Sequence, residues 1–379
     1  MWYDLIKKEG EKMIQQQRLD RLTDWLKAGG IDAAFVHSPE NVYYFTNFMC
    51  HPHERLLGLF VFPEAESFLV CPKMEEQAAR EAGWTGHVIG YDDAEDPWAL
   101  IREEWSRRSF KNRLNIAIEE HVVSYARSQE LQTLAEEVRF CSLDETLNQL
   151  RLVKDERERQ ILKEAARLAD EAVQVGIEHL KEGCTEMDIV AQIELAMKKK
   201  GVAAMSFPTM VLFGEKTALP HGNPGLNRLK IGDLVLFDLG VVWNGYCSDI
   251  TRTVAFGSAG SKQREIYLLV QEAQQAAIDA ARPGVRMGDL DQIARKKISD
   301  AGYGAYFTHR LGHGLGISVH EYPSLHGKND HPLKEGMVFT VEPGVYVPGV
   351  GGVRIEDDVY IAKDGAELLT SFPKDLIFV

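Results

Sequence analysis

The chain is poor in cysteine, and the five it has are far apart. They form no CxxC pair and are odd in number: Cys50, Cys71, Cys141, Cys184 and Cys247. This spacing argues against a disulfide framework and against a zinc site built from thiolates. It is typical of a reducing compartment, so we expect a cytoplasmic protein.

Long hydrophobic runs and an excess of basic residues are also missing. No uninterrupted apolar run approaches the roughly 18 residues of a membrane span. The N-terminus, MWYDLIKKEGEKM, lacks the apolar core of a signal peptide. The formal net charge of −14 argues against a nucleic-acid binder, which would carry a basic face. We therefore expect neither a membrane nor a nucleic acid as a partner.

The 379 residues are enough for two domains, and the predicted elements divide at about residue 150. Residues 1–150 are expected to form a small α/β domain. Its first helix runs from about residue 10 to Gly29-Gly30. Strands are predicted at 33–36, 57–62, 67–70 and 114–118, and helices near 74–82, 97–108 and 124–137.

The charged stretch RLVKDERERQ (151–160) marks the start of the second domain, residues 151–379. It opens a long helix that is expected to stop at Gly183. Beyond it, the predicted strands are longer and more antiparallel. A weak internal repeat aligns residues 183–201 with 284–302: each has a glycine, an aspartate five residues later, an amphipathic helix and a closing glycine. The repeat predicts two similar halves with a cleft between them.

A β-hairpin with two aspartates is predicted at VLFDLGVVWNGYCSDITRT (235–253). Asn244-Gly245 is a strong signal for a two-residue type I′ turn, which pairs Trp243 with Tyr246 and sets Asp238 opposite Thr251. Asp238 and Asp249 then lie diagonally on one face of the sheet. Burying unpaired carboxylates is costly, so a compensating positive charge is expected there. The alternative is that one aspartate caps a turn and the other is solvated.

A second predicted hairpin, residues 337–361, carries two glutamates. Glu342 and Glu356 are nearly symmetric about a loop at residues 348–352. Asp357 and Asp358 are expected to point elsewhere or to end the ladder. A solvated edge is the alternative for either glutamate alone.

Three histidines lie between the hairpins, in THRLGHGLGISVHEYP (308–323). The glycines on both sides of His313 forbid a regular helix and allow a close approach of the backbone. A lone histidine is more often a core or surface residue than a ligand, but three among glycines favour a site.

Two aspartates, two glutamates and one histidine would suit two divalent cations. The four negative charges balance two such ions, and oxygen and imidazole ligands fit Mn²⁺, with Co²⁺ or Zn²⁺ as alternatives. A pair of ions about 3.5–4 Å apart can activate a water molecule and polarise a carbonyl. The expected metal ligands are Asp238, Asp249, His313, Glu342 and Glu356.

With these motifs in order, the sequence resembles the pita-bread metallopeptidases, the family of prolidase, aminopeptidase P and methionine aminopeptidase. The matching segments are FDLG, SDITRT, GHGLG, TVEPG and RIEDD. The resemblance implies an α+β protein. A creatinase-like α/β N-terminal domain precedes a pita-bread catalytic domain with pseudo-two-fold symmetry, antiparallel strands and flanking helices. It also implies a homodimer.

Further roles come from the same resemblance. Glu342 is similar to the glutamate that moves a proton from the attacking water to the leaving amine. His320 resembles a residue that stabilises the tetrahedral intermediate, and His221 one that lines the pocket near the scissile bond. His309 and Arg354 match positions that bind proline or the substrate carboxylate. A salt bridge from Arg354 to Asp357 or Asp358 is the structural alternative.

The segment CHPHERLLGLF (50–60) resembles a loop that reaches the neighbouring subunit's active site in prolidase-like dimers. His53 and Arg55 are its expected substrate-binding residues, and a solvated loop tip is the alternative.

The expected function is that of a dinuclear-metal Xaa-Pro dipeptidase. The closest alternative is an aminopeptidase P, which acts on longer peptides with proline in the second position. A creatinase-like hydrolase or a metal-free binding module would lack the complete ligand set, whereas a lyase could retain it.

Overall fold

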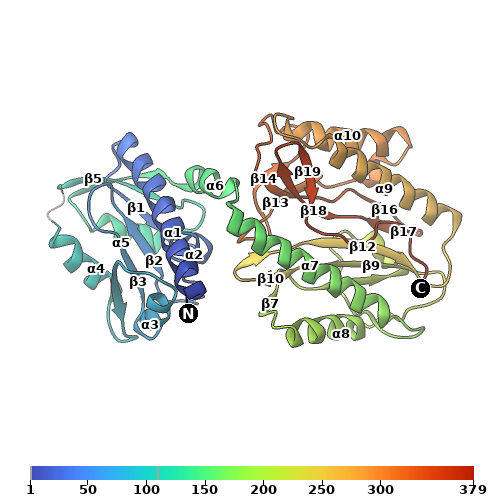
Figure 1. Cartoon of the computed structure of the whole chain (residues 1–379), viewed down its shortest axis with the longest axis horizontal. Coiled ribbons are helices and arrows are strands. Elements are labelled where there is room, and N and C mark those ends of the chain that lie inside the picture. Colours follow the sequence, from blue (N-terminus) through green and yellow to red (C-terminus); the bar gives the residue numbers. More distant parts are fainter. Residues whose placement is uncertain (1, 109–110) are drawn as a thin grey trace. The chain divides into compact units, whose positions relative to one another are not determined.

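The computed structural model describes residues 2–108 and 111–379 (Figure 1). The chain forms two compact units, Met1–Arg151 and Leu152–Val379. Among the described residues, no helix combines the length and the apolar character that crossing a membrane requires.

The first unit is built on a six-stranded mixed sheet in the order β4-β3-β2-β1-β5-β6. Strands β1, β5 and β6 are parallel to one another, as are β3 and β4, whereas β2 runs antiparallel to both β1 and β3. The strands are β1 (Ala33–Val36), β2 (Gly58–Val61), β3 (Phe68–Pro72), β4 (His87–Tyr91), β5 (Arg113–Ile118) and β6 (Glu137–Ser142). The helices are α1 (Trp2–Gly29), α2 (Pro39–Thr46), α3 (Glu76–Glu81), α4 (Pro97–Ser106), α5 (Tyr125–Gln132) and α6 (Asp144–Leu152).

The four strands predicted for this unit are confirmed, and four elements were missed: α2, β4, β6 and α6. The predicted helix at 124–137 is too long, because α5 ends at Gln132 and β6 begins at Glu137. Helix α1 ends at Gly29 as expected but begins at Trp2. Strand β6 has no fully buried residue, so it lacks the continuous apolar run of a central strand.

The second unit begins with helix α7 (Glu156–Glu178). Asp155 caps it, since its side chain accepts a hydrogen bond from the Glu158 amide at 2.9 Å, and the Asp155 amide in turn donates to the Glu158 carboxylate at 2.8 Å. This capping box explains why the helix starts within the charged stretch. The helix ends at Glu178 rather than at Gly183, so the predicted end is wrong.

The internal repeat is confirmed. Helix α8 (Glu186–Lys199) and helix α10 (Met287–Asp300) each have 14 residues. Each begins three residues after a glycine with positive φ, 82° at Gly183 and 89° at Gly284. A residue with a side chain would be strained at these positions, which is why both repeats start with glycine.

Each half has its own hydrophobic core. Helices α7 and α8 pack on the sheet β12-β9-β8, around Phe237 and Ile250. Helices α9 (Ser261–Ala280) and α10 pack on the sheet β14-β13-β15-β18-β19, around Phe339 and Val359. Figure 1 shows the two helix pairs flanking the strands of this unit.

The strands of the second unit come in hairpins. In the first half they are β7 (Ala204–Met205), β8 (Met210–Phe213), β9 (Leu234–Leu239), β10 (Val241–Trp243), β11 (Tyr246–Cys247) and β12 (Ile250–Ala255). In the second half they are β13 (Gly312–Gly314), β14 (Glu321–Leu325), β15 (Val338–Val341), β16 (Gly344–Val347), β17 (Gly351–Arg354), β18 (Asp357–Ala362) and β19 (Gly365–Leu368).

Candidate metal centre

The first hairpin has the predicted register. Asn244 and Gly245 have φ values of 45° and 80°, as a type I′ turn requires at both central residues. Trp243 pairs with Tyr246, and Asp238 lies opposite Thr251. The turn therefore fixes which face of the sheet carries Asp238 and Asp249.

The second hairpin sets its two glutamates opposite each other. Gly344 pairs with Arg354 in β16–β17, and Val341 pairs with Asp357 in β15–β18. Glu342 and Glu356 occupy the opposing positions between these two ladders. The loop is shorter than expected, because Gly351 and Gly352 belong to β17. Asp357 forms the last pair of the β15–β18 ladder with Val341, and neither Asp357 nor Asp358 lines the cavity of the two glutamates, so both point elsewhere as expected.

His313 sits in a strand where backbones approach closely. A Cβ atom on Gly312 would lie 1.9 Å from the Thr340 carbonyl oxygen, and one on Gly314 would lie 2.3 Å from that of Tyr322. Only glycine fits on either side of His313, as the sequence suggested. The strand β13 is thereby held firmly against its neighbours, with the imidazole of His313 buried.

All nine site residues predicted in the catalytic unit line one cavity of about 460 Å³. They come from both hairpins, from the glycine-rich segment around β13 and from the loop after β8. These residues are Asp238, Asp249, His313, Glu342, Glu356, His221, His309, His320 and Arg354.

The predicted ligand atoms converge within this cavity. One ligand atom each from Asp249, His313 and Glu356 lies within 4.8 Å of the other two. His313 Nε2 is 3.4 Å from Glu342 Oε1 and 3.8 Å from Asp249 Oδ2. Its Nδ1 lies 3.1 Å from the Gly314 carbonyl oxygen, which orients Nε2 toward the carboxylates.

The residues fit a divalent cation. Asp238 Oδ1 and Asp249 Oδ1 are buried and accept no hydrogen bond from the described part of the chain. A buried carboxylate oxygen without a partner is costly, and oxygen ligands of this kind are what Mn²⁺ and related ions prefer. These two aspartate oxygens support a cation between the hairpins.

The electrostatics of the cavity agree with that fit. Burial, together with the carboxylates of Glu356 and Asp238, raises the pKa of Asp249 well above its usual value. Burial and the neighbouring Glu342 do the same to the pKa of Glu356. Burial and the nearby His320 lower the pKa of His313 to about 3, so its imidazole is neutral, the form that binds metals. A divalent cation would stabilise the charged forms of the carboxylates.

Arg354 contacts neither of the acids considered as its salt-bridge partners, so that alternative is wrong. Its Nη2 pairs with Asp238, its Nη1 donates to the Tyr346 hydroxyl at 2.6 Å, and its Nε donates to Thr251 Oγ1 at 3.1 Å. Asp357 pairs instead with Arg252. Arg354 in β17 and Asp238 in β9 belong to different hairpins, so the acids that neighbour Arg354 in the sequence did not identify its partner.

The histidines have distinct surroundings. His309 Nε2 lies 2.9 Å from the Tyr346 hydroxyl oxygen, and its Nδ1 lies 2.8 Å from the Arg310 carbonyl oxygen. Burial, with Arg354 nearby, lowers the pKa of His309 to about 4. The ring of His320 meets that of His313 edge-on at 4.1 Å between centroids. His221 lies on an exposed part of the cavity wall.

His53 and Arg55 belong to the first unit. Arg55 Nε pairs with Asp93 at 2.7 Å, and its Nη1 lies 3.2 Å from Glu54 Oε1. His53 has a φ of 57°, which places it in a tight turn. Their role in substrate binding stays a prediction.

Three cavity or cavity-adjacent residues were missed by the sequence. Arg310 lines the cavity and donates to Ser324 Oγ at 3.0 Å. Tyr346 joins His309 to Arg354. Thr251 Oγ1 donates to Glu356 Oε2 at 2.6 Å. The hairpin register that put Thr251 opposite Asp238 was the signal that could have identified Thr251.

Known proteins resemble the chain over nearly its whole length. Residues 18–153 match the Creatinase/Prolidase N-terminal domain, and residues 160–363 match metallopeptidase family M24. The chain is 47% identical over 360 residues to the Xaa-Pro dipeptidase of Lactobacillus delbrueckii subsp. lactis, covering 94% of this chain and 98% of that protein.

Solved structures give the same result. The prolidase from Pyrococcus horikoshii OT3 superposes with a TM-score of 0.87 at 36% identity, covering 95% of this chain and 100% of that one. The X-Pro aminopeptidase from Thermotoga maritima MSB8 superposes with a TM-score of 0.84 at 32% identity, covering 92% of this chain and 98% of that one. The chain therefore belongs to metallopeptidase family M24, with a creatinase/prolidase N-terminal domain in front of the catalytic domain.

Proposed function

We propose that this protein is an Xaa-Pro dipeptidase that works with two divalent cations, of which Mn²⁺ is the first candidate and Co²⁺ or Zn²⁺ the alternatives. The observation that carries the proposal is that four carboxylates and one neutral imidazole line a single cavity. The relatives named Xaa-Pro dipeptidase and prolidase support the choice of substrate.

Asp238, Asp249, His313, Glu342 and Glu356 would hold the cations. Bound there, the ions would supply a nucleophilic water at neutral pH and polarise the carbonyl of the scissile bond. The chain's own part is to fix these side chains: Thr251 orients Glu356, Arg354 orients Asp238, and the Gly314 carbonyl orients His313.

Glu342 is the proposed proton carrier. In the metal-free site, burial raises its pKa to about 7, with Arg354 opposing the shift and Asp238 adding to it. A bound cation would lower this pKa, and a carboxylate positioned beside the attacking water can accept its proton and return it. Glu342 Oε1 lies 3.3 Å from Thr340 Oγ1, which holds the carboxylate in place. The returned proton would go to the proline nitrogen, a secondary amine that must be protonated to leave.

His320, His221 and His309 would contact the substrate. We assign His320 to the oxyanion that develops on the scissile carbonyl, because a fixed donor there lowers the barrier. His221 would line the pocket beside the scissile bond. His309, fixed by Tyr346 and the Arg310 carbonyl, would pack against the proline ring.

The free carboxylate of proline is what separates a dipeptide from a longer peptide. Two guanidinium groups line the cavity, Arg354 and Arg310. Arg354 is the residue expected to bind this carboxylate, but its donors already serve Asp238, Tyr346 and Thr251. Arg310 has Ser324 as its side-chain partner and is the second candidate. Arg310→Met should raise KM for Xaa-Pro and leave KM for the Xaa-Pro amide unchanged if Arg310 binds the carboxylate.

The decisive assay compares substrates. With Mn²⁺ present, an Xaa-Pro dipeptide should be hydrolysed faster than Xaa-Pro-Yaa-Zaa. Faster turnover of the tetrapeptide would favour the aminopeptidase P alternative. The resemblance to the X-Pro aminopeptidase of Thermotoga maritima supports testing this alternative. A homodimer is also proposed, and sedimentation velocity tests it.

A further inference from the structure

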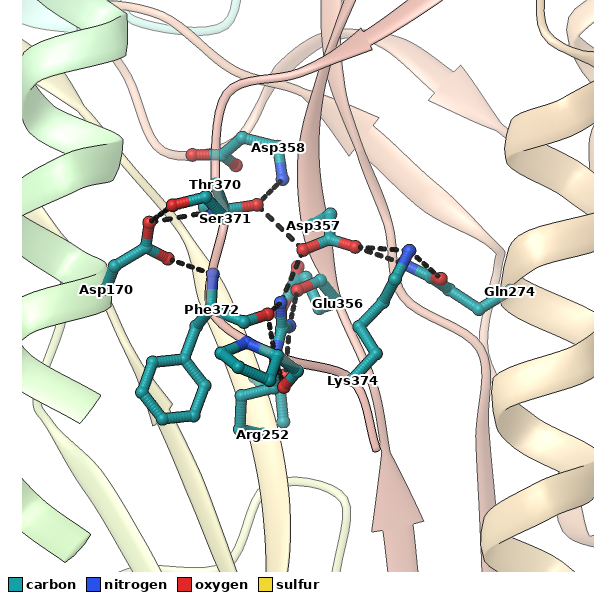
Figure 2. A network of polar contacts seen from close by, with 12 residues as sticks. Asp170, Arg252, Gln274, Glu356, Asp357, Asp358, Thr370, Ser371, Phe372 and Lys374 are labelled. Atoms are coloured by element: carbon teal, nitrogen blue, oxygen red, sulfur yellow. Dashed lines mark hydrogen bonds and ion pairs between the residues drawn. The ribbon is translucent and has the colours of Figure 1, made fainter. Parts of the chain in front are cut away.

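A buried polar network lies behind the proposed metal ligands, and Arg252 is at its centre (Figure 2). Arg252 is only 1% exposed. Its Nη1 donates to two backbone carbonyls, those of Thr251 (3.0 Å) and Glu356. These carbonyls belong to the two different hairpins, so one guanidinium joins both backbones.

The bonds of Arg252 reach both sides of the metal centre. Glu356 is itself a proposed ligand, and its amide donates to the Thr251 carbonyl at 3.1 Å. Thr251 is two residues from Asp249, and its hydroxyl holds the Glu356 carboxylate at 2.6 Å. The carboxylate and the backbone of Glu356 are therefore fixed by the same short segment of β12.

Asp357 balances the charge of Arg252. Its Oδ1 accepts from Arg252 Nη2 at 2.6 Å and from Thr370 Oγ1 at 2.8 Å. Its Oδ2 accepts from Gln274 at 2.7 Å and lies 3.2 Å from Lys374 Nζ. Because Asp357 follows Glu356 directly, any shift of Asp357 is passed to the ligand.

The C-terminal segment Thr370–Lys374 closes the network (Figure 2). The Phe372 carbonyl accepts from Arg252 Nη2 at 2.7 Å, and Asp170 of α7 accepts from the amides of Ser371 (2.8 Å) and Phe372 (3.0 Å). Thr370 Oγ1 also accepts from the Asp358 amide at 3.2 Å. Asp358 in turn accepts from the amide of Asp249 at 3.1 Å, which extends the network to a second ligand.

We propose that the segment Thr370–Lys374, acting through Arg252, Asp357 and Asp358, positions Asp249 and Glu356 and so sets the metal affinity of the site. This inference rests on the proposed metal centre. Partners that orient metal ligands from behind typically change metal affinity by about 10–100-fold when they are removed. Lys374 and Thr370 are positioning residues, because neither lines the cavity.

The test is the affinity of the full-length protein for Mn²⁺. Lys374→Met removes the ammonium group that faces Asp357 and keeps the length of the side chain, which is 18% exposed. We expect the dissociation constant for Mn²⁺, measured by isothermal titration of the chelator-treated and dialysed protein, to rise about tenfold. Lys374→Arg should restore most of the affinity. Lys363 is an exposed lysine in the turn between β18 and β19. Lys363→Met is therefore the matched control and should bind Mn²⁺ as the wild type does.

Thr370→Val is the second variant, since it keeps the shape and removes the hydroxyl between Asp357 and the Asp358 amide. Thermal unfolding of the chelator-treated proteins checks that each variant folds. Unchanged Mn²⁺ affinity in both Lys374→Met and Thr370→Val would overturn this inference alone. Failure of the wild type to bind Mn²⁺ would instead overturn the proposed metal centre.

Discussion

Replacing Asp249 with asparagine should have opposite effects with and without metal. In the chelator-treated protein, the carboxylates of Asp249 and Glu356 approach within 4.8 Å. Two like charges at this distance repel by about 3 kcal/mol at an effective dielectric constant of 20. Asp249→Asn removes that repulsion and leaves the backbone bond from residue 249 to Asp358 intact. The chelator-treated variant should therefore be more stable than the chelator-treated wild type.

The magnitude can be measured by thermal unfolding. For a unit of this size, about 3 kcal/mol corresponds to an increase in Tm of about 6–12 °C. Mn²⁺ at about a hundred times its dissociation constant should add about 2.7 kcal/mol to the wild type by mass action. The variant, lacking one ligand, should gain much less. Hydrolysis of Xaa-Pro by the variant should be nearly abolished.

The pH dependence has a definite sign. Burial and neighbouring carboxylates raise the pKa of Asp249, so in the absence of metal this group contributes stability at low pH that is lost as pH rises. The advantage of Asp249→Asn should be small near pH 4 and should grow toward pH 7. Asp364→Asn, which removes an exposed charge in the turn between β18 and β19, is the control and should change little. The reasoning is refuted if the chelator-treated Asp249→Asn protein melts at or below the wild type at pH 7.

Three further predictions concern other parts of the chain. Tyr346→Phe removes the hydroxyl between His309 and Arg354 and should lower kcat/KM by about 10–100-fold with a small change in Tm. An unchanged kcat/KM would show that this hydroxyl does not position His309. Gly312→Ala places a Cβ 1.9 Å from the Thr340 carbonyl oxygen and should lower the free energy of unfolding, measured in urea, by about 1–3 kcal/mol or more. Gly10 has open space around it, so Gly10→Ala is the control and should not destabilise the protein. Burial, assisted by Arg127, lowers the pKa of His37, so the unfolded chain binds more protons than the folded one below pH 6.5. The free energy of unfolding of the first unit should therefore fall by up to about 1.4 kcal/mol per pH unit on acidification. His37→Asn should remove this pH dependence, and an unchanged dependence in urea titrations at pH 5 and 7 would contradict the prediction.

The sequence predicted the local geometry well where the signals act over a few residues. Asn244-Gly245 fixes a turn, the turn fixes the register, and the register fixes the face on which Asp238 lies. The glycines around His313 and at the start of the two repeated helices mark positions where a side chain is excluded by space or by φ. Such constraints act within a few residues, so a single sequence reveals them.

Long-range partners were not predictable in the same way. The acids next to Arg354 in the sequence are its obvious candidate partners, yet its partner Asp238 is 116 residues away. The C-terminal segment gave no signal of its own, although Phe372 contacts Arg252 across 120 residues. Strand β6 and helix α2 were missed because one is half exposed and the other is a short helix of mixed aromatic and polar residues. Each of these features depends on tertiary packing rather than on local pattern.

The central claim is that five side chains from separate segments hold two cations in one cavity. A crystal structure of the protein grown with Mn²⁺, with anomalous diffraction recorded at the manganese edge, tests it most directly. Two anomalous peaks are expected among Asp238, Asp249, His313, Glu342 and Glu356. A cavity without manganese, or manganese bound only elsewhere on the chain, would contradict it.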